Sequence, residues 1–239
     1  MNHQASSTHQ WLAGQVVAIT GASGTLGRSL TRTLLQEGAK VLALTTSQNS
    51  SFQEGVEVVC WQAGQEEELR DRLQSINILI INHGINVHGD RSPAAIQKSF
   101  QVNTFSAWNL AELFLSTVDP ADSDTLKELW INTSEAEVGP AISPLYELSK
   151  RTLGHLITLR RLDAPCVIRK LILGPFKSNL NPIGVMSADW VGRAIVFLAK
   201  RGFRNIIVTI NPLTYLAFPL KEVSQSLYFQ LFSKSGVPS

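Results

Sequence analysis

The stretch that decides the fold is Val16-Val-Ala-Ile-Thr20, followed directly by Gly21-Ala-Ser-Gly24-Thr-Leu-Gly27. A short Val- and Ile-rich run is typical of a buried strand, and a helical pattern starts immediately after the glycines. The same alternation of strand and helix continues along the chain, which indicates repeated βαβ units and a parallel sheet. We predict seven strands, at Val16–Thr20, Val41–Thr45, Val56–Trp61, Ile78–Asn82, Leu129–Thr133, Cys166–Leu173 and Ile206–Ile210. The predicted helices are Thr25–Glu37, Glu66–Ser75, Pro93–Val118, Ser143–Leu162 and Ser187–Arg201.

The glycines of this first loop each have a physical role. Gly21 permits a tight turn, Gly24 lets the backbone approach a pyrophosphate, and Gly27 lets the helix pack closely on the strand. Phosphates would lie at the helix N-terminus, where free N–H groups and the positive dipole end favour an anion. No charged side chain precedes Arg28 in the loop, so backbone donors must bind the phosphates. The predicted phosphate loop comprises Gly21, Ser23, Gly24, Thr25, Leu26 and Gly27.

The composition limits the protein class. The chain has 239 residues, 44% of them hydrophobic and 17% charged, which suffices for one sizeable core and excludes intrinsic disorder or a disulfide-stapled miniprotein. Cys60 and Cys166 provide neither a metal cluster nor a disulfide framework. The first 12 residues lack a signal-peptide pattern, and no run of about 18 apolar residues is present to span a bilayer. We expect a soluble, cytoplasmic protein with a polar tail at residues 1–13 and one doubly wound α/β domain at 14–239.

Charge is distributed unevenly along the chain. Residues 1–149 hold 8 Lys/Arg and 16 Asp/Glu, a net charge of −8, whereas residues 150–239 hold 13 and 3, a net charge of +10. Two interpretations are open: the charges of both halves intermingle on one folded surface, or the C-terminal part faces an anionic ligand or lipid surface. The total of +2 argues neither for nor against nucleic acid, and we predict no nucleic-acid partner.

The end of the second predicted strand bears on the choice of cofactor. A cofactor with a free ribose 2′-hydroxyl usually meets Asp or Glu here, but the sequence reads Leu44-Thr45-Thr46-Ser47-Gln48. No acid repels a 2′-phosphate, and the hydroxyls of Thr45, Thr46 and Ser47 can donate to it, with Arg28 or another base assisting. The sequence therefore favours NADP(H) over NAD(H).

Tyr146-Glu-Leu-Ser-Lys150 places a phenol and an ammonium at positions i and i+4, on one face of a predicted helix. A tyrosine with its ordinary pKa of about 10 is a poor base at neutral pH, and a nearby cation lowers that pKa. The pair predicts a group that exchanges a proton with a carbinol oxygen.

With these two motifs in order, the chain resembles a short-chain dehydrogenase/reductase from about Gly14 to Asn211, which implies a single Rossmann domain. Ile81-Asn82-His83-Gly84 resembles the Asn-Asn-Ala-Gly turn of the family, with Asn82 and Gly84 retained. Asn103 resembles the family's structural asparagine, whose carbonyl helps to hold a proton-relay water near the lysine. The glycine spacing with Gly24 follows the extended and atypical branches of the family.

Further motifs extend the resemblance to the substrate and the nicotinamide. Ile131-Asn132-Thr133-Ser134 resembles the segment with the substrate-orienting serine; the usual spacing selects Thr133, the motif alignment selects Ser134, and we choose Ser134. Leu173-Gly-Pro-Phe-Lys-Ser178 resembles the nicotinamide-binding Pro-Gly-Pro-Val-x-Thr. Gln62 takes the place of an adenine-binding Asp. The resulting predicted cofactor contacts beyond the loop are Thr45, Thr46, Ser47, Gln62, Asn82, Gly84, Tyr146, Lys150, Gly174, Phe176 and Ser178.

The resemblance implies hydride transfer at the nicotinamide, with an alcohol or carbonyl as small-molecule substrate. Tyr146 would be the general acid or base, Lys150 would lower its pKa and bind the ribose, and Ser134 would hydrogen-bond the reacting oxygen, with Asn103 completing the set. Two alternatives remain: a nucleotide-sugar epimerase or dehydratase of the extended branch, and a non-enzymatic dinucleotide sensor. His83 and His88 lack a third ligand, so we predict no metal site.

The C-terminal tail from about residue 212 is too apolar for a surface loop. Leu216, Leu220, Val223, Leu227 and Leu231 recur at helical spacing, and such a stripe covers the core, a neighbouring subunit, a substrate entrance or a lipid surface. We expect a homodimer or tetramer, and peripheral membrane contact is the sharper hypothesis. The run 82–90 and the tail 205–221 resemble cyanobacterial family members associated with sterol-desaturase-like domains, which implies at most a lipid-like substrate.

Overall fold

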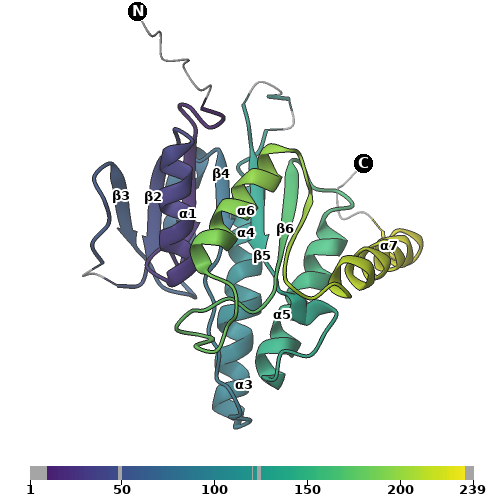
Figure 1. Cartoon of the computed structure of the whole chain (residues 1–239). Helices are drawn as coiled ribbons and strands as arrows, with labels where there is room; N and C mark the ends of the chain where they lie inside the picture. Colours follow the sequence, from purple (N-terminus) through teal and green to yellow (C-terminus); the bar gives the residue numbers. More distant parts are fainter. Residues whose placement is uncertain (1–9, 48–49, 120, 123–124, 235–239) are drawn as a thin grey trace, which may run out of the picture.

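The computed structural model describes residues 10–47, 50–119, 121–122 and 125–234. Seven parallel strands form one sheet in the order β3-β2-β1-β4-β5-β6-β7, which confirms the predicted doubly wound fold (Figure 1). Parallel strands are usually joined by a helix, and helices connect all consecutive strands except β2 and β3, between which the described residues contain none. The strands are β1 Val16–Thr20, β2 Lys40–Thr45, β3 Val56–Cys60, β4 Ile78–Ile81, β5 Glu128–Asn132, β6 Val167–Leu173 and β7 Asn205–Val208.

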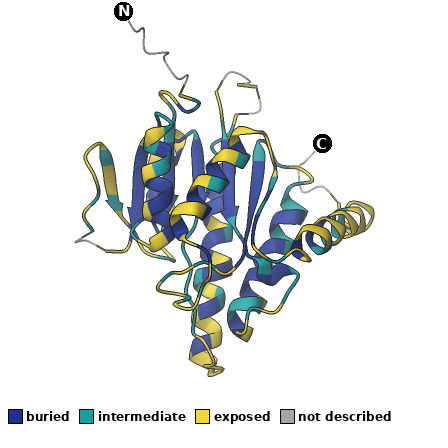
Figure 2. Ribbon diagram, viewed as in Figure 1, coloured by how far each residue is buried: buried dark blue, intermediate teal, exposed yellow. Residues whose placement is uncertain are grey.

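Helices cover both faces of the sheet. Helices α1 and α6 pack on one face, while α2, α4 and α5 pack on the other, and each layer has its own buried apolar cluster (Figures 1 and 2). Strands β1, β2, β4, β5 and β6 are buried on both faces, which explains their near-continuous apolar sequence, whereas the edge strand β3 is largely exposed. The helical elements are α1 Thr25–Gln36, η1 Glu66–Leu69, α2 Arg70–Gln74, α3 Pro93–Phe100, η2 Gln101–Ser106, α4 Ala107–Leu115, η3 Glu135–Glu137, α5 Pro144–Arg160, α6 Ala188–Lys200 and α7 Thr214–Phe232.

The structure corrects the predicted end of the N-terminal tail. Trp11 stacks on Trp130 with the ring centroids 6.3 Å apart, and Leu12 is fully buried in the α1–α6 layer. The polar tail predicted through residue 13 therefore ends before Trp11, because these two side chains gain apolar burial. Residues 1–9 lie outside the described residues.

The long helix predicted at Pro93–Val118 is also corrected. It consists of α3, a π-helical segment η2 and α4, which ends at Leu115. A π-helical segment shifts the side chains that follow it around the axis, and such segments are frequent at functional sites. Asn103, one of the predicted site residues, lies in η2.

Helix α7 confirms the helical spacing of the tail but places the stripe differently from a core helix. The buried residues of α7 are Thr214, Phe218 and Glu222. The leucine and valine stripe is exposed, and the Leu231 side chain is 76% exposed (Figure 2). The interpretation that this stripe covers the protein's own core is therefore wrong. None of the helices in the described ranges has the length and apolarity to cross a membrane.

Candidate active site

The phosphate loop has the backbone geometry that its glycines predict. Gly21 has a φ of +62°, and a Cβ at Gly27 would lie only 2.3 Å from the carbonyl oxygen of Gly21. Gly24 is the N-cap of α1, and the first turn of α1 contains no acidic residue. Free N–H groups and the positive end of the helix dipole are therefore available to phosphate, and the loop fits a dinucleotide.

Of the three hydroxyls predicted to donate to a 2′-phosphate, one is buried and two are exposed. Thr45 is buried, where its hydroxyl donates to the Ser23 hydroxyl at 2.8 Å and accepts from the Ser47 amide at 3.1 Å. These hydrogen bonds connect the end of β2 to the phosphate loop, so Thr45 would influence a bound phosphate through Ser23. Thr46 and Ser47 are exposed at the same edge, and Gln48 lies outside the described residues.

A basic side chain lies beside this edge. The Arg28 guanidinium donates to the carbonyl oxygen of Ser23 at 3.0 Å and to that of Ser51 at 2.8 Å, and it lies over the ring of Phe52. The Arg28 guanidinium therefore lies next to the phosphate loop, as expected for a side chain that helps to bind a 2′-phosphate. Gln62 is exposed just after β3, whose end is bonded to β2 through the Trp61 amide and the Thr45 carbonyl.

The turn after β4 is held by a threonine that the sequence analysis did not select. The Thr20 hydroxyl accepts from the amide of Asn82 at 2.9 Å and contacts Nδ1 of His83 at 2.8 Å. Burial and, secondarily, the Lys150 ammonium lower the pKa of His83 to about 3, so the ring is neutral. A Cβ at Gly84 would lie 3.8 Å from Lys150 Nζ, which places this backbone inside the site.

Asn103 fixes the backbone that follows this turn. Its Oδ1 accepts from the Ile85 amide at 2.8 Å, and its Nδ2 donates to the Ile85 carbonyl at 3.0 Å and to the Ser149 hydroxyl at 3.0 Å. The side chain is fully buried, and its amide therefore joins η2, the β4 turn and α5. Ser149 is a second contributor that the sequence analysis missed.

The structure brings Ser134, Tyr146 and Lys150 together at the carboxyl ends of β4 and β5. The Ser134 side chain hydrogen-bonds to Tyr146, and Lys150 Nζ donates to the carbonyl oxygen of Asn132 at 2.8 Å. Thr133 is fully buried, and its hydroxyl points toward the carbonyl of Leu171. Of the two hydroxyls that the sequence left open, the one beside the tyrosine is that of Ser134.

Burial dominates the pKa values of both Tyr146 and Lys150. Burial raises the pKa of Tyr146, and the hydrogen bond from Ser134 lowers it by less. Burial also lowers the pKa of Lys150 to about 8, against the opposing effect of the Glu137 carboxylate. The net pKa shift of Tyr146 is upward because removing the phenol from water dominates, and the effect of Lys150 on this pKa stays a prediction.

The segment after β6 lies beside the same edge. The bridge between Phe176 and Met186 anchors it, and Ser178 exchanges backbone hydrogen bonds with Asn181. Gly174 is required sterically, since a Cβ there would lie 2.3 Å from the Thr209 hydroxyl and 2.7 Å from Glu135 Oε2. The sequence analysis did not select the Glu135 carboxylate, because none of the motifs described above includes it.

Comparison with known proteins agrees with this geometry. Residues 15–163 match the family described as short chain dehydrogenase. The chain belongs to this family. Its members bind an NAD(P) dinucleotide, and the glycine loop described above fits one.

The chain is similar to two curated relatives in sequence and to one solved structure in fold. A monoglucosyldiacylglycerol epimerase from Synechocystis sp. is 56% identical over 231 residues, covering 94% of this chain and 56% of that protein. The chain thus spans little more than half the length of this relative. The ketoacyl reductase HetN from Nostoc sp. is 27% identical, covering 95% of this chain and 91% of that protein. A Burkholderia cenocepacia short chain dehydrogenase in complex with NADP superposes with a TM-score of 0.74 at 19% identity, covering 93% and 99% of the two chains.

Proposed function

We propose that the protein epimerises a sugar hydroxyl of a glycosyl diacylglycerol by transient oxidation and re-reduction, using NADP(H). The observation that carries this proposal is the 56% identity with the glycolipid epimerase over a region that includes all the site residues. The predicted nucleotide-sugar epimerase shares this chemistry, but its substrate class has no such support.

The residues of the site divide the work between binding and proton transfer. The loop Gly21–Gly27 and Lys150 would hold the dinucleotide, which would supply hydride acceptance from the carbinol carbon and hydride return to the opposite face of the ketone. Tyr146 accepts the hydroxyl proton in the first half and gives it back in the second, and Ser134 hydrogen-bonds the reacting oxygen. Lys150 holds positive charge beside the phenol and the nicotinamide ribose. Substrate and product have the same oxidation level, so the cofactor is regenerated in each turnover.

The preference for NADP(H) rests on the edge of the sheet beyond β2. Thr46 and Ser47 are exposed there, and Arg28 lies against the phosphate loop through Ser23. Hydroxyl and guanidinium donors suit a 2′-phosphate, and a carboxylate would repel it. Fluorescence titration should give tighter binding of NADPH than NADH, and Thr46→Asp should reverse that order.

Net reduction of a carbonyl group is the second candidate, favoured by the 27% identity with a ketoacyl reductase. The two activities differ in their cofactor balance. We would incubate the protein with monoglucosyldiacylglycerol in detergent micelles and a substoichiometric amount of NADP(H), and identify the hexose after acid hydrolysis of the recovered glycolipid. Conversion to an epimer well beyond the amount of cofactor, without net change in NADPH absorbance, supports the epimerase. Consumption of NADPH in proportion to a ketoacyl substrate, without sugar inversion, supports the reductase.

We further propose that α7 contacts the membrane that holds this lipid substrate. Leu216, Leu227 and Leu231 on its outer face are 66%, 55% and 76% exposed. The segment 223–232 contains no charged residue, while the C-terminal part of the chain carries an excess of basic residues. An uncharged, aromatic-containing helix face beside basic groups suits the interface of an anionic bilayer.

A further inference from the structure

Ser134 lies at the start of η3, a short turn with two acidic side chains, the half-buried Glu135 and the buried Glu137. The Ser134 hydroxyl accepts from the Ala136 amide at 3.0 Å, so the orientation of this hydroxyl depends on the conformation of η3. Glu135 and Glu137 flank Ala136. A three-residue turn has few hydrogen bonds of its own, so its conformation depends on what its side chains contact.

Glu135 ties η3 to the junction between β7 and α7. Its carboxylate accepts from the Thr209 hydroxyl at 2.8 Å, from Asn211 Nδ2 at 2.6 Å and from the Thr214 hydroxyl. Three donors thus converge on one carboxylate, and Gly174 leaves the space that it occupies. The start of α7 and the serine of the candidate site are therefore joined through a single side chain.

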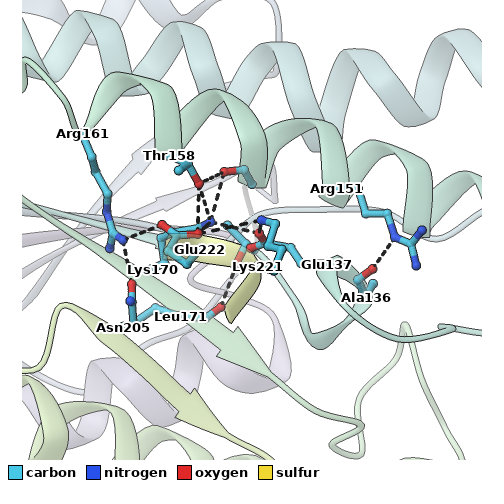
Figure 3. A network of polar contacts seen from close by, with 12 residues as sticks. Ala136, Glu137, Arg151, Thr158, Arg161, Lys170, Leu171, Asn205, Lys221 and Glu222 are labelled. Atoms are coloured by element: carbon cyan, nitrogen blue, oxygen red, sulfur yellow. Dashed lines mark hydrogen bonds and ion pairs between the residues drawn. The ribbon is translucent and has the colours of Figure 1, made fainter. Parts of the chain in front are cut away.

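Glu137 ties the other end of η3 to β6 and to the middle of α7 (Figure 3). Its fully buried side chain accepts from Lys170 Nζ at 2.9 Å and from Lys221 Nζ. Gly154 of α5 makes room for it, since a Cβ there would lie 2.3 Å from the carboxyl carbon. Burial opposes ionisation, but Lys170 and Lys221 together outweigh it and lower the pKa of Glu137.

Lys170 joins this carboxylate to a second one from α7. Its fully buried ammonium also donates to Glu222 Oε2 at 2.9 Å and to the Thr158 hydroxyl at 3.1 Å, and Glu222 accepts from Arg161 at 3.0 Å (Figure 3). Buried ion pairs are weak contributors to net stability, because desolvation offsets their attraction. What this cluster does achieve is a fixed geometry among α5, β6, α7 and η3.

We propose that Glu135 and Glu137 are positioning residues that fix the Ser134 hydroxyl by clamping η3 to β6 and α7. This inference rests on the proposed function only in assigning Ser134 to the reacting oxygen. Neither carboxylate touches the substrate; each acts through the turn that holds the serine.

A double-mutant cycle separates positioning from general stabilisation. We expect Glu135→Ala to lower kcat by about tenfold to a hundredfold, the size of effect produced by slight misplacement of a reacting group. In a Ser134→Ala background the same change should cost almost nothing further, since the hydroxyl that it positions is gone. Equal losses in both backgrounds would overturn the proposal. Thr214→Val gives a milder test, because it removes one donor to Glu135 without changing any residue of η3.

Hydrogen exchange of the peptide 133–139 provides a readout that does not require turnover. Exchange there should be faster in Glu135→Gln and Thr214→Val than in the wild type, because the Ala136 amide loses its fixed acceptor. Glu128→Gln is the matched control: it breaks the buried ion pair with Arg169 at the opposite end of β5 and should leave this peptide and kcat unchanged. Equal exchange in the Thr214, Glu135 and control variants refutes the clamp. A wild type inactive on glycolipid, with faster exchange in the Glu135 and Thr214 variants, refutes the proposed function and leaves the clamp standing.

Discussion

At the scale of single residues, Tyr146 is the group whose chemistry can be tested most directly. Tyr146→Phe removes the phenolic proton and keeps the ring, so we expect kcat to fall by about 10²- to 10⁴-fold. The dissociation constant for NADPH should stay nearly the same, because the packing of the ring is retained. Tyr228→Phe, at an exposed position on α7, is the control and should leave both quantities unaltered. Wild-type turnover by Tyr146→Phe would contradict the assigned role.

His83 predicts a pH dependence of stability. Its pKa falls from 6.5 in the unfolded chain to about 3 in the folded protein, so below pH 6.5 the unfolded state binds one more proton. Stability is therefore lost as the pH falls from 6.5, at about 1.4 kcal/mol per pH unit. His83→Gln should reduce the loss between pH 6.5 and 4 by about 3 kcal/mol, measured by urea unfolding. His88→Gln, at an exposed position, is the control; an unchanged slope in His83→Gln would refute the assignment.

Short sequence motifs identified residues of the candidate site but not the pKa direction of its tyrosine. Tyr146, Lys150 and Gly84 were found because short motifs carry them, and the structure brings them together. The pKa direction of Tyr146 could not be obtained in the same way, since it depends on how deeply the phenol is buried. Spacing along a helix says which groups share a face, but not how much water reaches them.

At the scale of elements, the strands were predictable to within one or two residues. Apolar runs bounded by glycine or polar residues mark each one, and β1 matches its predicted bounds. The π-helical segment η2 was not predictable, because its apolar spacing resembles that of the α-helices on either side. Its position follows from the hydrogen bonds that bury Asn103 and Thr104 against α5.

Helix α5 offers a substitution whose sign is unusual. Replacing glycine by alanine inside a helix ordinarily stabilises it by about 1 kcal/mol. Gly154→Ala should instead destabilise the protein by about 1–3 kcal/mol, because the new methyl group overlaps the Glu137 carboxylate. Urea unfolding measures the change, with Leu148→Ala on the exposed face of α5 as the control. A gain in stability would show that Glu137 moves without cost.

At the scale of the whole molecule, the exposed face of α7 predicts association with lipid. The wild type should sediment with anionic vesicles and less so at high salt, because screening weakens attraction of its basic C-terminal part. Leu227→Ser with Leu231→Ser should abolish sedimentation, whereas Val58→Ser, an exposed apolar position on β3, should not. Absence of vesicle binding, with a dimer that dissociates when α7 is altered, would assign this face to subunit contact instead.

The same scale explains why the clamp on η3 escaped sequence analysis. The phosphate loop and the Tyr-Lys pair are local patterns, but Glu135 and Thr214 are 79 positions apart. Glutamates in a short polar segment look like solvated surface residues until the fold brings buried donors to them. Only the register of β5, β6 and β7 places these groups at one edge.

The long separation of these partners has a consequence for biosynthesis. Lys221 follows Glu137 by 84 positions, which a ribosome adds in about 4 to 17 seconds. During that interval β1 to β5 are already available to pair, while both carboxylates of η3 still lack their donors from α7. The nascent chain therefore acquires its sheet first and its serine geometry last. Under the proposed clamp, the Ser134 hydroxyl is fixed only when translation has passed the middle of α7.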